Sequence, residues 1–160
     1  MPTIAIASSK GGSGKSTTAA LLAMTLAEHG ATVTVIDADP NRPIAKWAQH
    51  AGKPDSLTVL SEVTESTITD TIEESGRRAQ FVIIDLEGSA SLMVCLAISR
   101  ADLVIIPTQG SPLGATETAG TVRLVKIQEI AALQNPGSDS VYPHQRRDAA
   151  AQDGSASTAL

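Results

Sequence analysis

Short apolar runs alternate with longer segments of helical periodicity over the first 134 residues of the chain. Each run is rich in Ile, Val, Leu or Ala and is bounded by glycine, proline or polar residues, as expected of strands that are buried on both faces of a sheet. The runs occupy residues 4–7, 32–37, 57–60, 80–85 and 102–107. Helices are predicted between and after them, at residues 17–29, 44–50, 66–79, 91–100 and 115–133.

This alternation of strand and helix predicts the α/β class, with a doubly wound and mostly parallel sheet of about five strands and helices on both faces. Gly30 is expected to end the first helix as a C-cap residue, and Pro43 to open the second. We expect Trp47 to pack in the interior and Cys95 to be a small buried hydrophobe. Ligands bind such sheets at the carboxyl ends of the strands, so the site is expected there.

Residues 135–160 differ from the rest of the chain in composition. They hold mainly Pro, Gly, Ser, Asp, Ala and Gln, and no apolar run among them is long enough for a strand. Such a segment cannot bury enough apolar surface to offset the entropy lost on folding. We therefore expect one domain over residues 1–134 and a disordered tail over residues 135–160.

Charge and cysteine content exclude several classes of protein. The net charge of −5 argues against a general nucleic-acid-binding surface, because neutralising phosphates needs clustered Lys and Arg. The single cysteine cannot form an internal disulfide and suits a reducing compartment. No stretch approaches the roughly 18 apolar residues of a membrane span. We expect a soluble, cytoplasmic protein that does not use a membrane.

The segment 8–17 joins the first predicted strand to the first predicted helix and reads Ser-Ser-Lys-Gly-Gly-Ser-Gly-Lys-Ser-Thr. Its three glycines lack a Cβ, so the loop can turn successive backbone N–H groups toward a phosphate at the positive end of the helix. Lys15 would add charge at the β- and γ-phosphates, and Ser16 would offer a hydroxyl ligand to Mg²⁺. The expected nucleotide-binding residues are Gly11, Gly12, Ser13, Gly14, Lys15, Ser16 and Thr17.

The usual phosphate-binding loop has a glycine five residues before Gly14, where this chain has Ser9 followed by Lys10. Thr17 stands where a dinucleotide-binding loop has its third glycine, which disfavours that kind of site. The form Lys-Gly-Gly-x-Gly-Lys-Ser/Thr resembles the deviant Walker A motif of the ParA/MinD superfamily of ATPases. The resemblance implies that Lys10 crosses a nucleotide-sandwich dimer to contact phosphate in the partner's site, and that Thr17 contacts the α-phosphate.

An acidic motif follows the second predicted strand. Residues 37–41 read Asp-Ala-Asp-Pro-Asn and resemble the second motif of the ParA group, in which Gln is common in place of Asn41. By this resemblance Asp39 orients the attacking water and Asp37 supports the Mg²⁺ shell. The same residue types also suit a plain turn, so both interpretations stay open at this point.

A second acidic motif, Phe-Val-Ile-Ile-Asp at residues 81–85, is a Walker B pattern. A carboxylate at the end of a strand beside the glycine loop can reach the Mg²⁺ shell, usually through water, and Asp85 has this place. The following residues, 86–91, read Leu-Glu-Gly-Ser-Ala-Ser rather than Thr-Pro-Pro, which looks like the compact plasmid-partition ATPases. Gly88 is expected to let this loop move when a γ-phosphate arrives. Glu87 is a weaker candidate for the site, and its expected place is that of a solvated loop acid.

The resemblance covers residues 3 to about 130 and implies ATP hydrolysis with Mg²⁺, in a P-loop NTPase topology that is incomplete at the C-terminus. The residues that it assigns to catalysis are Lys10, Lys15 and Asp39, and those that it assigns to the metal are Ser16, Asp37 and Asp85. The implied role is plasmid partition by a homodimer that forms on ATP binding. The implied partners are a centromere-binding partition protein and non-specific DNA.

A second hypothesis is a truncated, catalytically inert nucleotide-binding remnant. After about residue 130 the chain has no match to the family's next strand, its adenine contacts or its terminal helices. Either the parent was shortened or the chain departs from its original reading frame, and the abrupt loss of periodicity favours the second. Small-molecule ligases with the same loop also remain open. A nitrogenase-type iron protein is excluded, because a dimer with one cysteine per chain cannot supply four thiolates.

Overall fold

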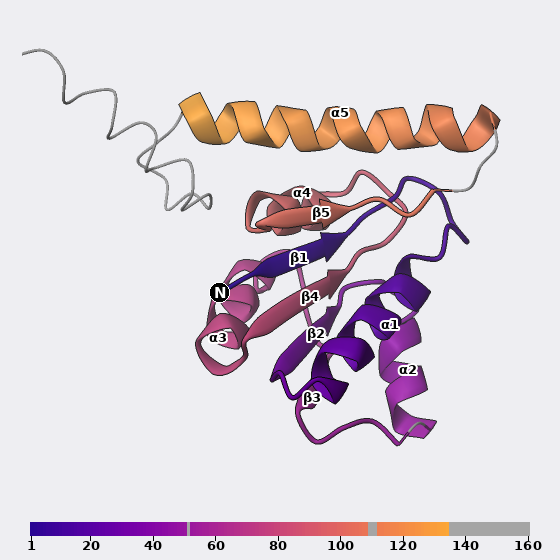
Figure 1. Ribbon diagram of the computed structural model, residues 1–160. Helices are drawn as coiled ribbons and strands as arrows, with labels where there is room; N and C mark the ends of the chain where they lie inside the picture. The colour runs from indigo at the N-terminus through magenta and orange to yellow at the C-terminus, as the bar shows by residue number, and fades with distance from the viewer. Residues whose placement is uncertain (51, 109–111, 135–160) are drawn as a thin grey trace, which may run out of the picture.

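Five parallel strands form one sheet in the order β3-β2-β4-β1-β5 (Figure 1). The computed structural model describes residues 1–50, 52–108 and 112–134; the segment 135–160, with its predicted disorder, lies outside them. The strands are β1 (Thr3–Ile6), β2 (Val33–Asp37), β3 (Leu57–Leu60), β4 (Phe81–Asp85) and β5 (Leu103–Ile105). Every neighbouring pair is parallel, which confirms the predicted sheet.

Helices cover both faces of this sheet, as the doubly wound prediction requires. In the described residues they are α1 (Lys15–Glu28), α2 (Pro43–His50), α3 (Ile68–Arg78), α4 (Leu92–Ser99) and α5 (Pro112–Gln134). Side chains of α1 and α2 pack on one face, and side chains of α3, α4 and α5 pack on the other. None of the helices in this part of the chain has both the length and the apolar character that crossing a membrane demands.

The central strand β4 divides the core between the two faces. Val82 and Ile84 belong to the cluster under α3 and α4, whereas Ile83 between them belongs to the cluster under α1. Successive side chains of a strand point to opposite faces, so a continuous apolar run serves both clusters. Trp47 packs against the α1 cluster, which confirms the prediction. Cys95 was predicted to be buried but is only partly buried. It lies on the flank of α4, beside the face that packs on the core.

Glycine and proline residues set the ends of α1 and the start of α5. Gly30, with φ of 87°, follows the cap residue of α1 and ends the helix as predicted. The helix begins at Lys15 rather than near residue 17, because Gly14 takes the left-handed conformation and acts as its N-cap. α5 begins at Pro112, three residues before the predicted start. A proline suits the first helical position, since its missing N–H has no acceptor there in any case.

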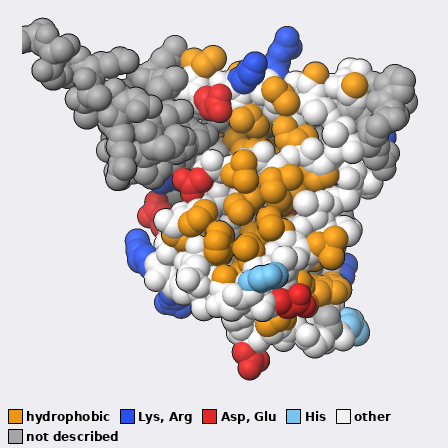
Figure 2. Space-filling model, viewed as in Figure 1, with side chains coloured by type: hydrophobic (Ala, Val, Ile, Leu, Met, Phe, Trp, Pro, Cys, Tyr) orange, Lys and Arg blue, Asp and Glu red, His pale blue; other side chains and the backbone are white. Residues whose placement is uncertain are grey.

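The β5 side of the molecule leaves apolar side chains exposed. Leu103 on β5 is 52% exposed, and Ile127 and Ile130 on α5 are each 53% exposed. Figure 2 shows hydrophobic side chains gathered on this face, below α5. Parallel sheets are normally covered on both faces by helices. The sheet is therefore less well covered here, in the described residues, than a parallel sheet usually is.

Candidate nucleotide site

Three of the predicted motifs meet at the carboxyl ends of β1, β4 and β2. Ile6 at the end of β1 is in register with Asp85 at the end of β4, and Asp85 is in register with Asp37 at the end of β2. A cavity of about 600 Å³ opens at this edge of the sheet. The residues that line it are Gly11, Gly12, Gly14, Lys15, Ser16, Thr17, Asp39, Pro40, Asn41, Glu87, Gly88 and Ser89.

Two of the three glycines of the loop take the positive φ values that were expected, whereas Gly11 does not. Gly12 and Gly14 have φ values of 74° and 91°, in the left-handed region that a side chain disfavours. Gly14 caps α1 without a side-chain hydrogen bond. The first N–H groups of a helix have no intrahelical acceptor. In α1 these are the N–H groups of Lys15, Ser16 and Thr17, and all three residues line the cavity. This wall of the cavity suits an anion such as a phosphate.

Lys15 is almost buried within the loop. Lys15 is 7% exposed. Its Nζ donates a hydrogen bond to the backbone carbonyl of Lys10 at 3.1 Å. A carbonyl satisfies one ammonium hydrogen without neutralising the charge. The ammonium group is thus held at the cavity wall by a neutral acceptor, which an anionic ligand can replace.

Asp85 ends β4 beside β1 and is 0% exposed, and it is not among the residues that line the cavity. Neither of its carboxylate oxygens has a hydrogen-bond partner among the described residues. Burial raises the pKa of Asp85 to about 6, although the nearby Ser16 hydroxyl and the Lys15 ammonium oppose the rise. A buried carboxylate left without a partner is costly, and a bound cation is one of the groups that remove the cost.

The two carboxylate oxygens of Asp37 have different surroundings. Its Oδ2 accepts a hydrogen bond from the backbone N–H of Ala45 in α2 at 2.8 Å, whereas its Oδ1 is buried and has no partner in the described structure. Burial also raises the pKa of Asp37, more than its backbone hydrogen bonds lower it. One oxygen therefore fixes α2 against the end of β2, and the metal-binding role of the other stays a prediction.

These oxygens fit Mg²⁺ rather than a metal held wholly by protein. The described residues contain no cluster of three or more His, Cys, Asp or Glu side chains arranged to hold a metal. Mg²⁺ prefers oxygen ligands, keeps several waters, and commonly takes one or two carboxylates together with substrate phosphates. Asp85 and the free oxygen of Asp37, beside the Ser16 hydroxyl, meet that requirement.

The motif at 37–41 forms the turn that was one of its two interpretations, and part of it also lies at the cavity. It is a turn, because the Arg42 N–H donates to the Asp39 carbonyl at 2.9 Å. Asp39 Oδ1 also accepts hydrogen bonds from the Asn41 backbone N–H at 2.8 Å and from Asn41 Nδ2 at 3.0 Å. Yet Asp39 also lines the cavity. Asn41 thus orients the carboxylate, and a water-positioning role for Asp39 stays a prediction.

Gly88 keeps the loop after β4 close to the glycine loop. A Cβ at this position would lie 3.4 Å from the backbone nitrogen of Gly11 and 3.4 Å from Lys15 Nζ. A methyl group there would stand where a phosphate is expected to meet both groups. A side chain at position 88 would therefore be in van der Waals contact with the glycine loop and would reduce the space beside Lys15.

We expect Gly88→Ala to weaken binding of ATP with Mg²⁺ by about tenfold, because the methyl group competes for the space beside Lys15. Fluorescence titration with an ATP analogue measures the change. Gly52→Ala is the matched control, since a Cβ at Gly52 would meet nothing within 4 Å. Equal affinities for the two variants would contradict the placement of phosphate beside Gly88.

Sequence reasoning missed two contacts of the site. Glu87 was expected to be solvated, but it is only partly exposed and lines the cavity. Its position directly after the Walker B strand was the available signal. Thr121 on α5 accepts a hydrogen bond from the Ser9 N–H at 3.1 Å, across 112 positions of sequence. No local pattern predicts a contact over that separation.

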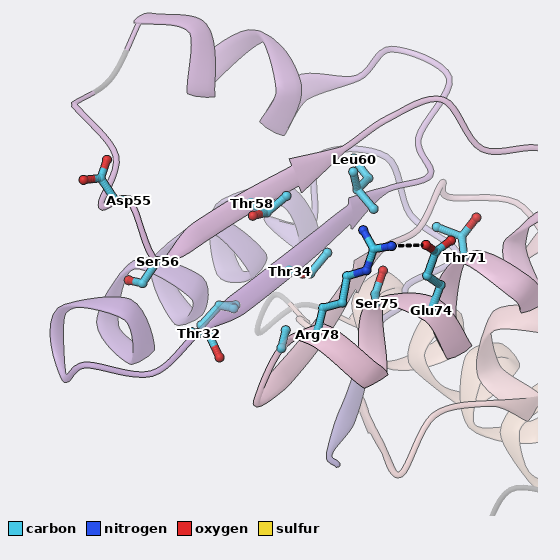
Figure 3. Close-up of a pocket in the computed structure, with 12 residues that line it drawn as sticks. Thr32, Thr34, Asp55, Ser56, Thr58, Leu60, Thr71, Glu74, Ser75 and Arg78 are labelled. Atoms are coloured by element: carbon cyan, nitrogen blue, oxygen red, sulfur yellow. Dashed lines mark hydrogen bonds and ion pairs between the residues drawn. The ribbon is translucent and has the colours of Figure 1, made fainter.

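A second cavity, of about 390 Å³, lies between β2, β3 and α3 (Figure 3). Half of the twelve residues that line it carry a hydroxyl group, among them Thr34, Thr58 and Ser75. Arg78 and Glu74 form an ion pair at 2.6 Å beside it. None of the predicted site residues lines this cavity, so it is separate from the nucleotide site.

Known proteins resemble the chain in sequence over most of its length. The family model described as VirC1 protein matches residues 1–146. Protein ParA of Rhizobium radiobacter is 49% identical over 131 residues, a match that covers 82% of this chain and 59% of that protein. The chain thus spans about three-fifths of the length of this relative.

Solved structures share the fold. An ATP complex of McdA from Cyanothece has a TM-score of 0.69 at 20% identity, and the match covers 82% of this chain and 65% of that one. A plasmid partition protein from Borrelia burgdorferi has a TM-score of 0.65 at 19% identity, over 81% of this chain and 74% of that one. At such identities the likeness shows the shared fold alone.

Proposed function

Since the chain belongs to the VirC1 family of ParA-like partition ATPases, we propose that it binds ATP with Mg²⁺ at the carboxyl ends of β1, β2 and β4 and hydrolyses it. The observation that supports this most is the state of Asp85. It is fully buried, both its oxygens lack partners in the described residues, and it ends the strand beside the glycine loop. A carboxylate in that position suits a cation bound together with phosphate.

The residues of the cavity divide the work of binding. The N–H groups of the glycine loop and of the first turn of α1 hold the phosphates. Lys15 exchanges its hydrogen bond to the Lys10 carbonyl for bonds to phosphate oxygens. Ser16, Asp85 and the unpartnered oxygen of Asp37 hold Mg²⁺. Bound Mg²⁺ supplies charge neutralisation to the β- and γ-phosphates.

Hydrolysis needs positioning and charge stabilisation rather than a covalent nucleophile. Asp39 orients the attacking water, with its carboxylate held in place by the two hydrogen bonds from Asn41. Lys10 offsets charge across a homodimer that forms on ATP binding. The loop with Gly88 lies against the glycine loop, where a γ-phosphate would displace it. Each of these roles is part of the proposal.

The biological role that we propose is partition, with a centromere-binding protein as the partner that stimulates ATP turnover. Protein ParA of Rhizobium radiobacter supports this assignment through its sequence identity, and the likeness in fold of the Borrelia partition protein is consistent with it. The net charge of −5 argues against DNA binding by this chain alone. Non-specific DNA is therefore not part of the proposal.

The second candidate is a nucleotide-binding module without segregation activity. Within the described residues β5 is an edge strand with the half-exposed Leu103 on it, which favours this candidate because an unpaired edge promotes association with other chains. This candidate predicts that the purified chain self-associates as its concentration rises, with or without ATP. A dimer that forms only with ATP and Mg²⁺ favours the first proposal. Sedimentation velocity separates the two.

Equilibrium binding of a fluorescent ATP analogue to the purified chain tests the proposal. We expect saturable binding that unlabelled ATP displaces, that weakens in EDTA, and that is accompanied by slow phosphate release. GTP as a competitor measures the selectivity for the base. A monodisperse chain that binds no analogue at about 1 mM would overturn the proposal, since that limit corresponds to about 4 kcal/mol of binding free energy.

A further inference from the structure

α5 is tied to the start of the glycine loop by a side-chain hydrogen bond. The backbone N–H of Ser9 donates to Thr121 Oγ1 at 3.1 Å. Thr121 is 5% exposed and lies on the buried side of the helix, where Leu124 and Val125 pack against the core. Figure 1 shows the loop after β1 passing beneath α5 before it turns into α1. A polar side chain thus occupies a buried position of α5 and accepts a hydrogen bond from the loop.

Neighbouring backbone groups connect this hydrogen bond to Lys15. Ser9 is followed directly by Lys10, whose N–H donates to Ser8 Oγ at 3.4 Å. The Lys10 carbonyl accepts the hydrogen bond from Lys15 Nζ at 3.1 Å. The position of the Lys10 peptide group therefore depends on how Ser9 is held. The resting position of the Lys15 ammonium depends on it in turn.

Close packing does not fix this junction. A cavity of about 200 Å³ lies between α5 and the two loops of the site, and Ser9, Glu87, Thr121 and Leu124 are among the residues that line it. A loop beside a cavity can shift more readily than one in a filled interior. The hydrogen bond from the Ser9 N–H to Thr121 Oγ1 crosses this junction and contributes a directed contact between α5 and the loop.

We infer that Thr121 is a positioning residue for the nucleotide loop. Its hydroxyl holds Ser9 so that the Lys10 carbonyl and the Lys15 ammonium stand ready for phosphate. This inference rests on the proposed binding of ATP with Mg²⁺. It makes α5, which lies outside the predicted motifs, a part of the binding machinery.

Thr121→Val removes the hydroxyl at nearly constant size. We expect it to weaken binding of a fluorescent ATP analogue with Mg²⁺ by about fivefold, the usual effect of one lost hydrogen bond. Backbone amides of residues 8–15 should exchange hydrogen about fivefold faster in the nucleotide-free protein, relative to the amides of β4. Thr121→Ser keeps the hydroxyl and should restore both values. Thr71→Val is the control, because the Thr71 hydroxyl donates within its own helix to the Thr67 carbonyl.

The two readouts separate this inference from the proposed function. Faster exchange at residues 8–15 in Thr121→Val, restored in Thr121→Ser, supports the positioning role even if the wild type binds no ATP, a result that would overturn the proposed function alone. Unchanged exchange and unchanged affinity in Thr121→Val would overturn the inference. So would a Thr121→Ser variant as impaired as Thr121→Val, because the methyl group would then be what matters. Normalising to β4 keeps the comparison valid in a less stable variant.

Discussion

Replacing Lys15 by alanine is expected to weaken binding of ATP with Mg²⁺ by at least about 100-fold. The Lys15 ammonium lies at the cavity wall, on a carbonyl that leaves its charge available for phosphate. Two charge-assisted hydrogen bonds of about 1.5–3 kcal/mol each make the loss about 3 kcal/mol or more, which corresponds to about 100-fold in affinity. The fold should survive, because the substitution removes a charge that is costly to bury.

Fluorescence titration of both proteins measures this loss, and circular dichroism confirms that the variant is folded. Lys46→Ala is the matched control, because Lys46 is exposed on α2 and does not line the cavity. Its affinity should equal that of the wild type. A folded Lys15→Ala protein that binds within about fivefold of the wild type would place the nucleotide somewhere other than the glycine loop.

The sequence was sufficient to predict the glycine loop because the chemistry of that loop is local. Gly12 and Gly14 take positive φ, and only glycine does so at little cost. The apolar runs before Asp37 and Asp85 likewise predicted that both carboxylates end strands. Parallel strands place their carboxyl ends at one edge of a sheet, so the meeting of these motifs followed from the fold class.

Contacts between distant segments were not predictable in this way. The strand order, which puts β4 between β1 and β2, was not predicted, although the shared edge for Asp37 and Asp85 was. The hydrogen bond from Ser9 to Thr121 depends on where α5 packs, which no motif records. The exposure of Glu87 was overestimated for the same reason. The sequence does not show that the glycine loop lies next to it across the cavity.

The pH dependence of the folded state can be worked out for Asp85. Burial raises its folded-state pKa from 3.8 to about 6, so the folded chain binds a proton more readily than the unfolded chain between those values. The charged carboxylate therefore destabilises the nucleotide-free fold. This penalty is absent below about pH 4, grows as the pH rises to about 6, and is complete at higher pH.

Asp85→Asn is therefore expected to stabilise the nucleotide-free protein while it abolishes binding that depends on Mg²⁺. About two pKa units set an upper limit of about 3 kcal/mol on the gain at pH 7.5. The cost of burying an amide without partners lowers the expected gain to about 1–2 kcal/mol. The gain should shrink as the pH falls and turn into a loss below about pH 4, where the wild-type carboxyl becomes protonated in both states and only the cost of the buried amide remains.

Urea unfolding in EDTA at pH 7.5 and pH 4 measures the change in the free energy of unfolding, and titration with an ATP analogue measures the loss of function. Asp55→Asn is the control, because Asp55 is exposed and away from the nucleotide cavity, and neither quantity should change. A group needed only for the fold would behave in the opposite way, because its removal would destabilise the protein. An Asp85→Asn protein that is less stable at pH 7.5 in EDTA would thus show that Asp85 is structural rather than a carboxylate held ready for Mg²⁺.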